Sequence, residues 1–107
     1  MEIKTKLIAN TNLRNYKYGT LCGYGCGYVG VPKGHPWHGK DYDDLRDVDV
    51  HGGLTWSDNY IRGDEEAGWW WVGFDTSHVG DDPINCDEDY CNEQIEKLKQ
   101  QALKAIV

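Results

Sequence analysis

Residues of alternating character recur in several stretches of the chain. A period of two is typical of β-strands, because successive side chains point to opposite faces of a sheet. The clearest stretches are 21–32 (LCGYGCGYVGVP) and 69–75 (WWWVGFD), and a shorter one covers 3–8. We therefore predict a strand in each. Alternation would divide the last stretch into two faces, one of Trp70, Val72 and Phe74 and the other of Trp69, Trp71, Gly73 and Asp75.

The segment 41–56 (DYDDLRDVDVHGGLTW) begins with acidic residues and then alternates, which predicts a further strand. Alternation would divide it into a core-facing side and an opposite side, with Val48 and Val50 on the first and Asp49 and His51 on the second. The two glycines that follow predict a kink before a short strand at 54–56.

The C-terminal part of the chain has the period of an amphipathic helix. Four residues recur there at spacings of four, three and four: Cys91, Ile95, Leu98 and Ala102. Asp87 and Asp89 precede or begin this pattern and are candidate N-caps. The 107 residues thus predict one domain, 1–107, of the α+β class. A small antiparallel β-sheet would pack against one C-terminal amphipathic α-helix.

The composition narrows the possible partners. The formal net charge is −7, which argues against direct binding to nucleic acid, because that needs clustered Lys and Arg. The chain has no apolar run of roughly 18 residues that could span a membrane, and its start lacks the apolar region of a signal peptide. We predict a cytoplasmic protein with no membrane partner. In that compartment the four cysteines would be mostly reduced, namely Cys22, Cys26, Cys86 and Cys91.

Two motifs in the sequence are only weak evidence of a cofactor or metal site. The stretch 25–30 (GCGYVG) satisfies G-x-G-x-x-G, but it lies inside a predicted strand and Pro32 follows it where a dinucleotide fold needs a helix. We therefore do not expect a dinucleotide cofactor. The cysteines form C-x3-C and C-x4-C pairs, whereas zinc ribbons usually place two residues between paired ligands. Four independent thiols are the favoured interpretation, with a four-cysteine zinc site as the alternative.

The most informative constellation joins DVDVHGG and GFDTSHVGD, each of which ends a predicted strand. If these strands are neighbours, Asp49, His51 and Asp75 share one face, and Trp71 provides an aromatic wall beside them. Such a mixture of an apolar wall and a few polar groups is typical of a small-molecule pocket. The residues expected to bind the ligand are His51, Gly52, Gly53, Thr55, Trp71, Asp75 and His78.

The same constellation has two other interpretations. It could be a metal site, with ligands from His51, Asp75, His78 and Asp81 and with Asp81 or Asp49 as the base in a hydrolytic reaction. It could also be structural. His51 would then be a core histidine bonded to a carbonyl, and Asp75 would cap the turn that follows it.

Three segments of the chain are distinctive as sequences: GYVGVPKGHP, DVDVHGGLT and WWWVGFDTSHVGD, followed by the amphipathic helix. Across 24–106 the chain resembles an uncharacterised family of small phage, prophage and bacterial proteins. The resemblance implies an accessory protein, often viral, that works inside a bacterial host cell. It implies no particular reaction.

These observations lead to three functional hypotheses. The favoured one is a small phage-type accessory protein whose polar and aromatic pocket binds a small ligand, with a nucleotide-like molecule suited to the aromatic wall. By analogy, its role would lie in host defence or host takeover. The first alternative is a metal-dependent hydrolase with a divalent metal such as zinc, the one cofactor that the residues suggest. The second is an acidic inhibitor that covers a host nucleic-acid-binding protein. The partner is thus a small molecule or a host bacterial protein.

Overall fold

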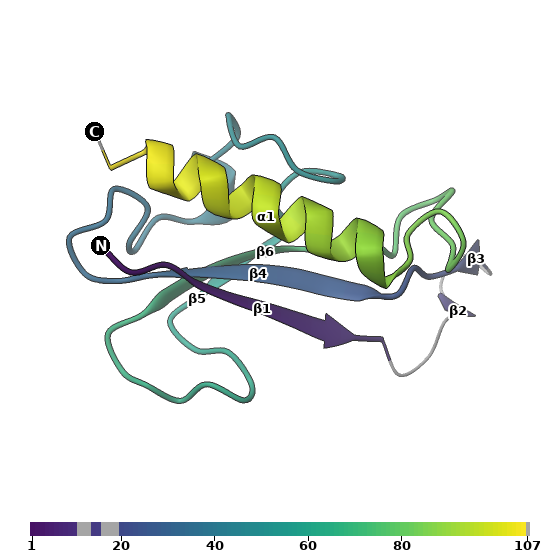
Figure 1. The fold of residues 1–107 in the computed structure, drawn as a ribbon, viewed down its shortest axis with the longest axis horizontal. Coiled ribbons are helices and arrows are strands. Elements are labelled where there is room, and N and C mark those ends of the chain that lie inside the picture. The colour runs from purple at the N-terminus through teal and green to yellow at the C-terminus, as the bar shows by residue number, and fades with distance from the viewer. Residues whose placement is uncertain (11–13, 16–19, 107) are drawn as a thin grey trace.

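The computed structural model describes residues 1–10, 14–15 and 20–106 (Figure 1). Along these residues the elements are β1 (Lys4–Ala9), β2 (Arg14–Asn15), β3 (Thr20–Leu21), β4 (Gly25–Val31), the 3-10 helix η1 (Tyr42–Asp44), β5 (Trp56–Asp58), β6 (Trp70–Phe74) and α1 (Glu88–Lys104). The strands predicted over 3–8, 21–32 and 69–75 correspond to β1, β4 and β6. The predicted helix corresponds to α1.

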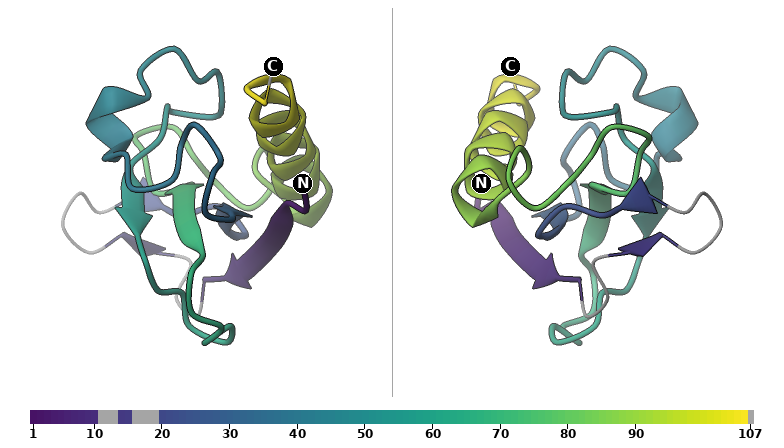
Figure 2. Two further views of the ribbon diagram at one scale, coloured as in Figure 1. Left: turned by 90° about the vertical axis from the view of Figure 1, so that its left-hand side faces the viewer. Right: turned by 90° about the vertical axis from the view of Figure 1, so that its right-hand side faces the viewer.

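A four-stranded antiparallel sheet is the centre of the fold, with the strand order β1-β4-β6-β5. β2 and β3 form a separate two-stranded sheet. α1 lies across one face of the larger sheet, and the segment around η1 covers the same face beside it (Figure 2). The loop between β5 and β6 lies on the other side. The prediction of a small antiparallel sheet with one C-terminal helix is confirmed.

The main core lies between α1 and the sheet. It contains Val29, Val31, Trp37, Val50, Val72, Phe74, Ile95, Leu98 and Ala102. α1 begins after Asp87, whose side chain accepts a hydrogen bond of 2.8 Å from the backbone N–H of Tyr90, so the predicted N-cap is present. The helix can approach β4 closely because Gly27 has no side chain, and a Cβ there would collide with Phe74 and Ile95. No helix among the described residues is long and apolar enough to cross a membrane.

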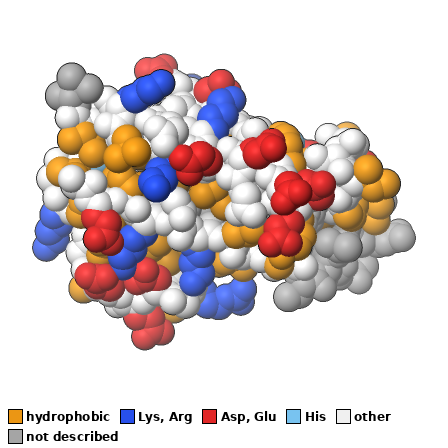
Figure 3. Space-filling model, in the orientation of Figure 1, with side chains coloured by type: hydrophobic (Ala, Val, Ile, Leu, Met, Phe, Trp, Pro, Cys, Tyr) orange, Lys and Arg blue, Asp and Glu red, His pale blue; other side chains and the backbone are white. Residues whose placement is uncertain are grey.

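A second apolar cluster covers the opposite face of the sheet. Its buried members are Ile61, Trp69 and Trp71, and Ile8, Tyr28 and Trp56 pack against them. The Lys4 ammonium lies 4.4 Å from the ring centroid of Trp69 and forms ion pairs with Asp64 (2.9 Å) and Glu66 (2.6 Å). Figure 3 shows acidic and basic side chains close together on this side of β1. The two faces predicted for 69–75 are thus confirmed, since Val72 and Phe74 face α1 and Trp71 faces away.

The strand predicted within 41–51 is wrong. This part of the chain consists of η1 and turns, and the short strand that follows begins at Trp56, two residues later than predicted. Val50 does face the core, but α1 takes the place of a neighbouring strand. The backbone N–H groups of Asp49 and His51 donate to the side-chain oxygens of Gln101 (2.8 Å) and Gln94 (2.9 Å). Alternation in this segment therefore reflects packing against a helix.

Candidate metal centre

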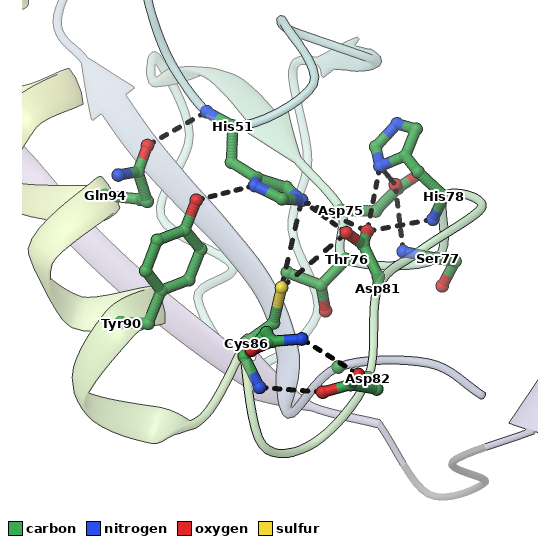
Figure 4. Close-up of polar contacts among 12 residues, drawn as sticks. His51, Asp75, Thr76, Ser77, His78, Asp81, Asp82, Cys86, Tyr90 and Gln94 are labelled. Atoms are coloured by element: carbon green, nitrogen blue, oxygen red, sulfur yellow. Dashed lines mark hydrogen bonds and ion pairs between the residues drawn. The ribbon is translucent and has the colours of Figure 1, made fainter.

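Three segments meet beside the first turns of α1 (Figure 4). His51 comes from the turn that follows η1. The loop after β6 contributes Asp75, His78 and Asp81, and α1 itself contributes Tyr90 and Gln94. In Figure 4 the imidazole of His51 lies between the helix residues on one side and Asp81 on the other.

His51 makes hydrogen bonds through both ring nitrogens. Its Nε2 lies 2.9 Å and 3.1 Å from the two carboxylate oxygens of Asp81, and its Nδ1 lies 2.7 Å from the hydroxyl of Tyr90. A carboxylate only accepts hydrogen bonds, so Nε2 carries a proton in this arrangement. In the neutral ring Nδ1 then accepts from the Tyr90 hydroxyl. Burial raises the pKa of Tyr90, which keeps that hydroxyl protonated.

Asp81 is the centre of the network and is 8% exposed. Its Oδ2 accepts a hydrogen bond of 2.9 Å from the backbone N–H of His78 and lies 3.1 Å from Nδ1 of the same residue. Burial favours the neutral carboxyl, but the hydrogen bonds from His51 and His78 outweigh it and lower the pKa of Asp81. The side chain is therefore an anion at neutral pH.

His78 is held against Gly52. A Cβ placed at Gly52 would lie 2.5 Å from Cε1 of His78, and the backbone there has a φ of +67°, a conformation that favours glycine. The centroids of the His51 and His78 rings are 5.7 Å apart. The side chain of His78 is 36% exposed, so this side of the network is open to solvent. Gly52 thus lets the second histidine approach the first.

These residues can supply a metal-ligand set. One ligand atom from each of His51, His78 and Asp81 lies within 4.8 Å of the other two, and this is the only such group in the part of the chain that the structure describes. Two donors that are each about 2.1 Å from a tetrahedral ion lie roughly 3.4 Å apart. The hydrogen-bonded separations of 2.9–3.1 Å are slightly shorter. The three ligand atoms lie within 4.8 Å of one another, so an ion could be bound after the histidine and carboxylate groups adjust their spacing and each ligating ring nitrogen loses its proton.

Cys86 lies beside this group but does not form a nucleophilic triad. Its Sγ is 3.6 Å from Oδ1 of Asp81 and 4.0 Å from Nε2 of His51. A catalytic triad needs the nucleophile and the carboxylate on different ring nitrogens, whereas here both face Nε2. Burial, and next the charge of Asp81, raise the pKa of Cys86 to about 11. The side chain is a neutral thiol that donates to Asp81.

The other cysteines do not join a metal-ligand group either. Cys22, Cys26, Cys86 and Cys91 are all free thiols, and Cys91 is in the buried stripe of α1. The group of three ligand atoms described above contains no cysteine. The choice between four independent thiols and a four-cysteine zinc site therefore stays a prediction.

Asp75 borders the network at the end of β6. Its Oδ1 lies 3.3 Å from Nδ1 of His78 and accepts a hydrogen bond of 3.3 Å from the backbone N–H of Ser77, and its Oδ2 accepts one of 3.5 Å from the hydroxyl of Thr55. The turn-capping interpretation of Asp75 is therefore confirmed. The same contacts place a partly exposed carboxylate next to the second histidine.

Two other residues of the predicted pocket, Trp71 and Gly53, do not have the roles that the prediction gave them. Trp71 is 1% exposed and packs in the cluster on the opposite face of the sheet, so it is not an aromatic wall beside His51. The backbone N–H of Gly53 donates to the carbonyl of Val50 over 2.8 Å. The pocket prediction paired Trp71 with His51 because it treated 41–51 as a strand, and that premise is wrong.

Sequence reasoning missed the helix side of the network. Tyr90 and Gln94 are one helical turn apart and both face the turn that holds His51. Their spacing indicates a shared helix face, but nothing local indicates which distant segment that face meets. The sequence presents Cys86 only as half of the C-x4-C pair, with no local sign of its contact with Asp81. His35, in contrast, is a buried structural histidine, since it contacts the Ala102 carbonyl (2.8 Å) and accepts from the Trp37 N–H (2.9 Å).

Comparison with protein-family models, with curated proteins and with solved structures finds no match to this chain. The resemblance to small phage and bacterial proteins therefore stays a prediction.

Proposed function

We propose that this protein binds one divalent transition metal, such as zinc, through His51, His78 and Asp81, and that the metal serves hydrolysis. The observation that carries the proposal is the convergence of these three side chains, from two loops, to within 4.8 Å of one another. Two imidazoles and one carboxylate are a ligand set that zinc accepts.

The surroundings of the three residues support a metal site of the open kind. Three protein ligands leave a fourth position for water, which is the pattern of catalytic zinc sites. The partly exposed ring of His78 gives solvent a route to that position. When His51 binds metal through Nε2, its Nδ1 must carry the proton and would donate to the Tyr90 hydroxyl. A partner of this kind fixes the ring of a metal-ligating histidine.

Hydrolysis is the reaction class that an open zinc position serves best. A bound metal lowers the pKa of water toward neutrality, so that hydroxide is available to attack an ester or phosphate bond. Asp75, whose Oδ1 lies 3.3 Å from Nδ1 of His78, would be placed to accept a proton from water at the open position. Asp49 is less suited to this role because it is exposed and pairs with Lys97 of α1 over 3.0 Å.

The metal interpretation is better supported than a small-molecule pocket at the same residues. The aromatic wall that such a pocket requires is on the other face of the sheet, where Trp71 is buried. The third hypothesis, an acidic inhibitor of a host protein, rests on the exposed acidic segment around η1 and on net charge alone. We infer that the protein works in the bacterial cytoplasm, because the four free thiols suit a reducing compartment.

The proposal is tested by titrating the metal-free protein with Zn²⁺ and Mn²⁺ in a calorimeter and by native mass spectrometry of the product. We expect one zinc per chain in the wild type. We expect affinity to fall by at least about tenfold in His78→Ala, since even outer partners of metal ligands contribute that much. His38→Ala is the matched control, because His38 is bonded to the Gly68 carbonyl away from the site. Equal zinc affinity in the two variants would refute the proposal.

A further inference from the structure

A pocket of about 300 Å³ opens on the face of the sheet opposite α1 and the candidate metal centre. Its lining residues come from β1, β4, β5 and the loop after β5, and they are Ile8, Tyr28, Trp56, Tyr60, Ile61 and Arg62. None of these residues belongs to the proposed metal site. The pocket therefore requires an explanation of its own.

Three of the six residues that line the pocket are aromatic. The rings of Tyr28 and Trp56 meet edge to face, with centroids 5.3 Å apart and an interplanar angle of 80°. Tyr60 is 51% exposed, whereas Ile61 beside it is buried. Exposed Tyr60 and half-buried Trp56 thus line one solvent-accessible pocket. Planar ligands stack on the faces of aromatic rings.

A cation stands at the edge of the pocket. Arg62 is exposed and forms no salt bridge with any residue that the structure describes. Arg62 and Tyr28 line the same pocket, and burial raises the pKa of the Tyr28 phenol, so that ring is uncharged. The Lys6 ammonium lies against Gly63, the next residue along the chain. Arg62 thus supplies a positive charge in a pocket wall whose other lining residues are aromatic or aliphatic.

We propose that this pocket binds a small planar aromatic anion, of which a nucleoside monophosphate is the leading example. The ring would stack between Trp56 and Tyr60, and the anionic group would pair with Arg62, whose planar guanidinium suits phosphate and carboxylate. The volume is at the lower end for small-molecule sites, so one ring system with one charged group fits and a dinucleotide does not. This ligand class is independent of the metal proposal.

The test is calorimetric binding of adenosine 5′-monophosphate, with adenosine, inorganic phosphate and indole-3-acetate as separate probes. We expect the monophosphate to bind at least about tenfold more tightly than adenosine or phosphate alone, because charge-assisted pairing and stacking act together. Binding of indole-3-acetate without the monophosphate would support the ligand class from a source other than nucleotides. Failure of both aromatic anions to bind at millimolar concentration would overturn the proposal, as would equal binding of adenosine and its monophosphate.

Two variants place the ligand in the pocket. Arg62→Gln should weaken binding of the monophosphate by at least about tenfold, since it removes the charged half of a charge-assisted pair. Arg46→Gln makes the same change of charge at an exposed arginine near η1 and should leave binding unaltered. Tyr60→Ala should also weaken binding roughly tenfold through lost stacking. If Arg62→Gln and Arg46→Gln bind alike, the anion does not sit at this pocket.

Discussion

Nε2 of His51 lies 2.9 Å from Oδ1 of Asp81, and this hydrogen bond joins the turn after η1 to the loop between β6 and α1. The two segments have no strand pairing with each other, so side chains hold them together. The same two side chains form the centre of the proposed metal site. The contact therefore has a structural consequence in the metal-free protein and a functional one when metal binds.

The structural consequence is measurable in Asp81→Asn. The substitution removes a buried charged acceptor from His51 and His78, so we expect the free energy of unfolding of the metal-free protein to fall by about 1–3 kcal/mol. Urea denaturation followed by tryptophan fluorescence gives this quantity. Asp49→Asn removes one carboxylate of an exposed pair with Lys97 and should change stability by under about 1 kcal/mol. The network does not stabilise the fold if the two variants are equally stable.

Tyr90→Phe tests whether the helix contributes to metal binding through His51. Loss of the hydroxyl leaves Nδ1 of His51 without its partner at 2.7 Å, and we expect zinc affinity to fall by about 10–100-fold. Calorimetric zinc titration measures the change. Tyr60→Phe removes an exposed hydroxyl on the other face of the sheet and serves as the control. Unchanged zinc affinity in Tyr90→Phe would limit Tyr90 to packing.

Substitutions at two adjacent glycines, Gly52 and Gly53, test whether the close approach of His78 to Gly52 matters for zinc binding. Gly52 and Gly53 have φ values of +67° and +76°, so alanine at either position strains the backbone and should cost about 1 kcal/mol of stability. A Cβ at Gly52 also collides with the ring of His78, whereas a Cβ at Gly53 meets no atom within 4 Å. We therefore expect only Gly52→Ala to weaken zinc binding. Zinc titrations that give the same affinity for both variants would show that the His78 position is not critical.

The ion pairs of Lys4 should make stability depend on pH. The hydrogen bonds that Lys4 donates lower the pKa of Asp64 and of Glu66, and the same bonds, to Glu66 first and then to Asp64, raise the pKa of Lys4. For the acids, the stabilisation is complete above their unfolded pKa values and is lost as pH falls through the lower folded values. For Lys4, it is complete below about pH 10 and is lost as pH rises through the raised folded pKa.

This dependence is checked by comparing the wild type with Lys4→Met in urea at a series of pH values. The difference in free energy of unfolding should be largest between about pH 5 and 10, and it should shrink toward pH 3 and toward pH 12. Lys104→Met changes an exposed lysine in the last turn of α1, on the other face of the sheet from these acids, and should show no such profile. A Lys4→Met difference that is constant with pH would mean that packing on Trp69, and not charge, carries the effect of Lys4.

Strands and helices with a strongly periodic pattern of hydrophobic residues were predictable, because that pattern is the same whichever element packs against them. The alternation of 69–75 and the helical stripe of Cys91, Ile95 and Leu98 each indicate a single buried face, and the sheet and helix are built on those faces. The segment 41–51 was not predictable in the same way. Its alternation is satisfied by α1, whose Gln94 and Gln101 side chains take the hydrogen bonds that a strand would have made.

Within the site, His51, His78 and Asp81 could be named from the sequence because polar residues gathered where predicted strands ended. The arrangement of these three residues in space could not be predicted from the sequence. The contact of His51 with Tyr90 joins residues 39 apart in the chain and depends on how α1 crosses the sheet. The same limit explains Trp71, which local alternation placed on the correct face of its strand but which packs on the opposite side of the sheet from His51.

The most direct measurement is the nitrogen-15 NMR spectrum of the histidine rings during titration of the metal-free protein with zinc. The chain has four histidines, so His35 and His38 serve as internal controls. We predict that Nε2 of His51 and one ring nitrogen of His78 shift to metal-bound values and saturate at one zinc per chain, while His35 and His38 keep their shifts. Rings of His51 and His78 that do not respond, or four rings that respond alike without saturating, would contradict a metal site at His51, His78 and Asp81.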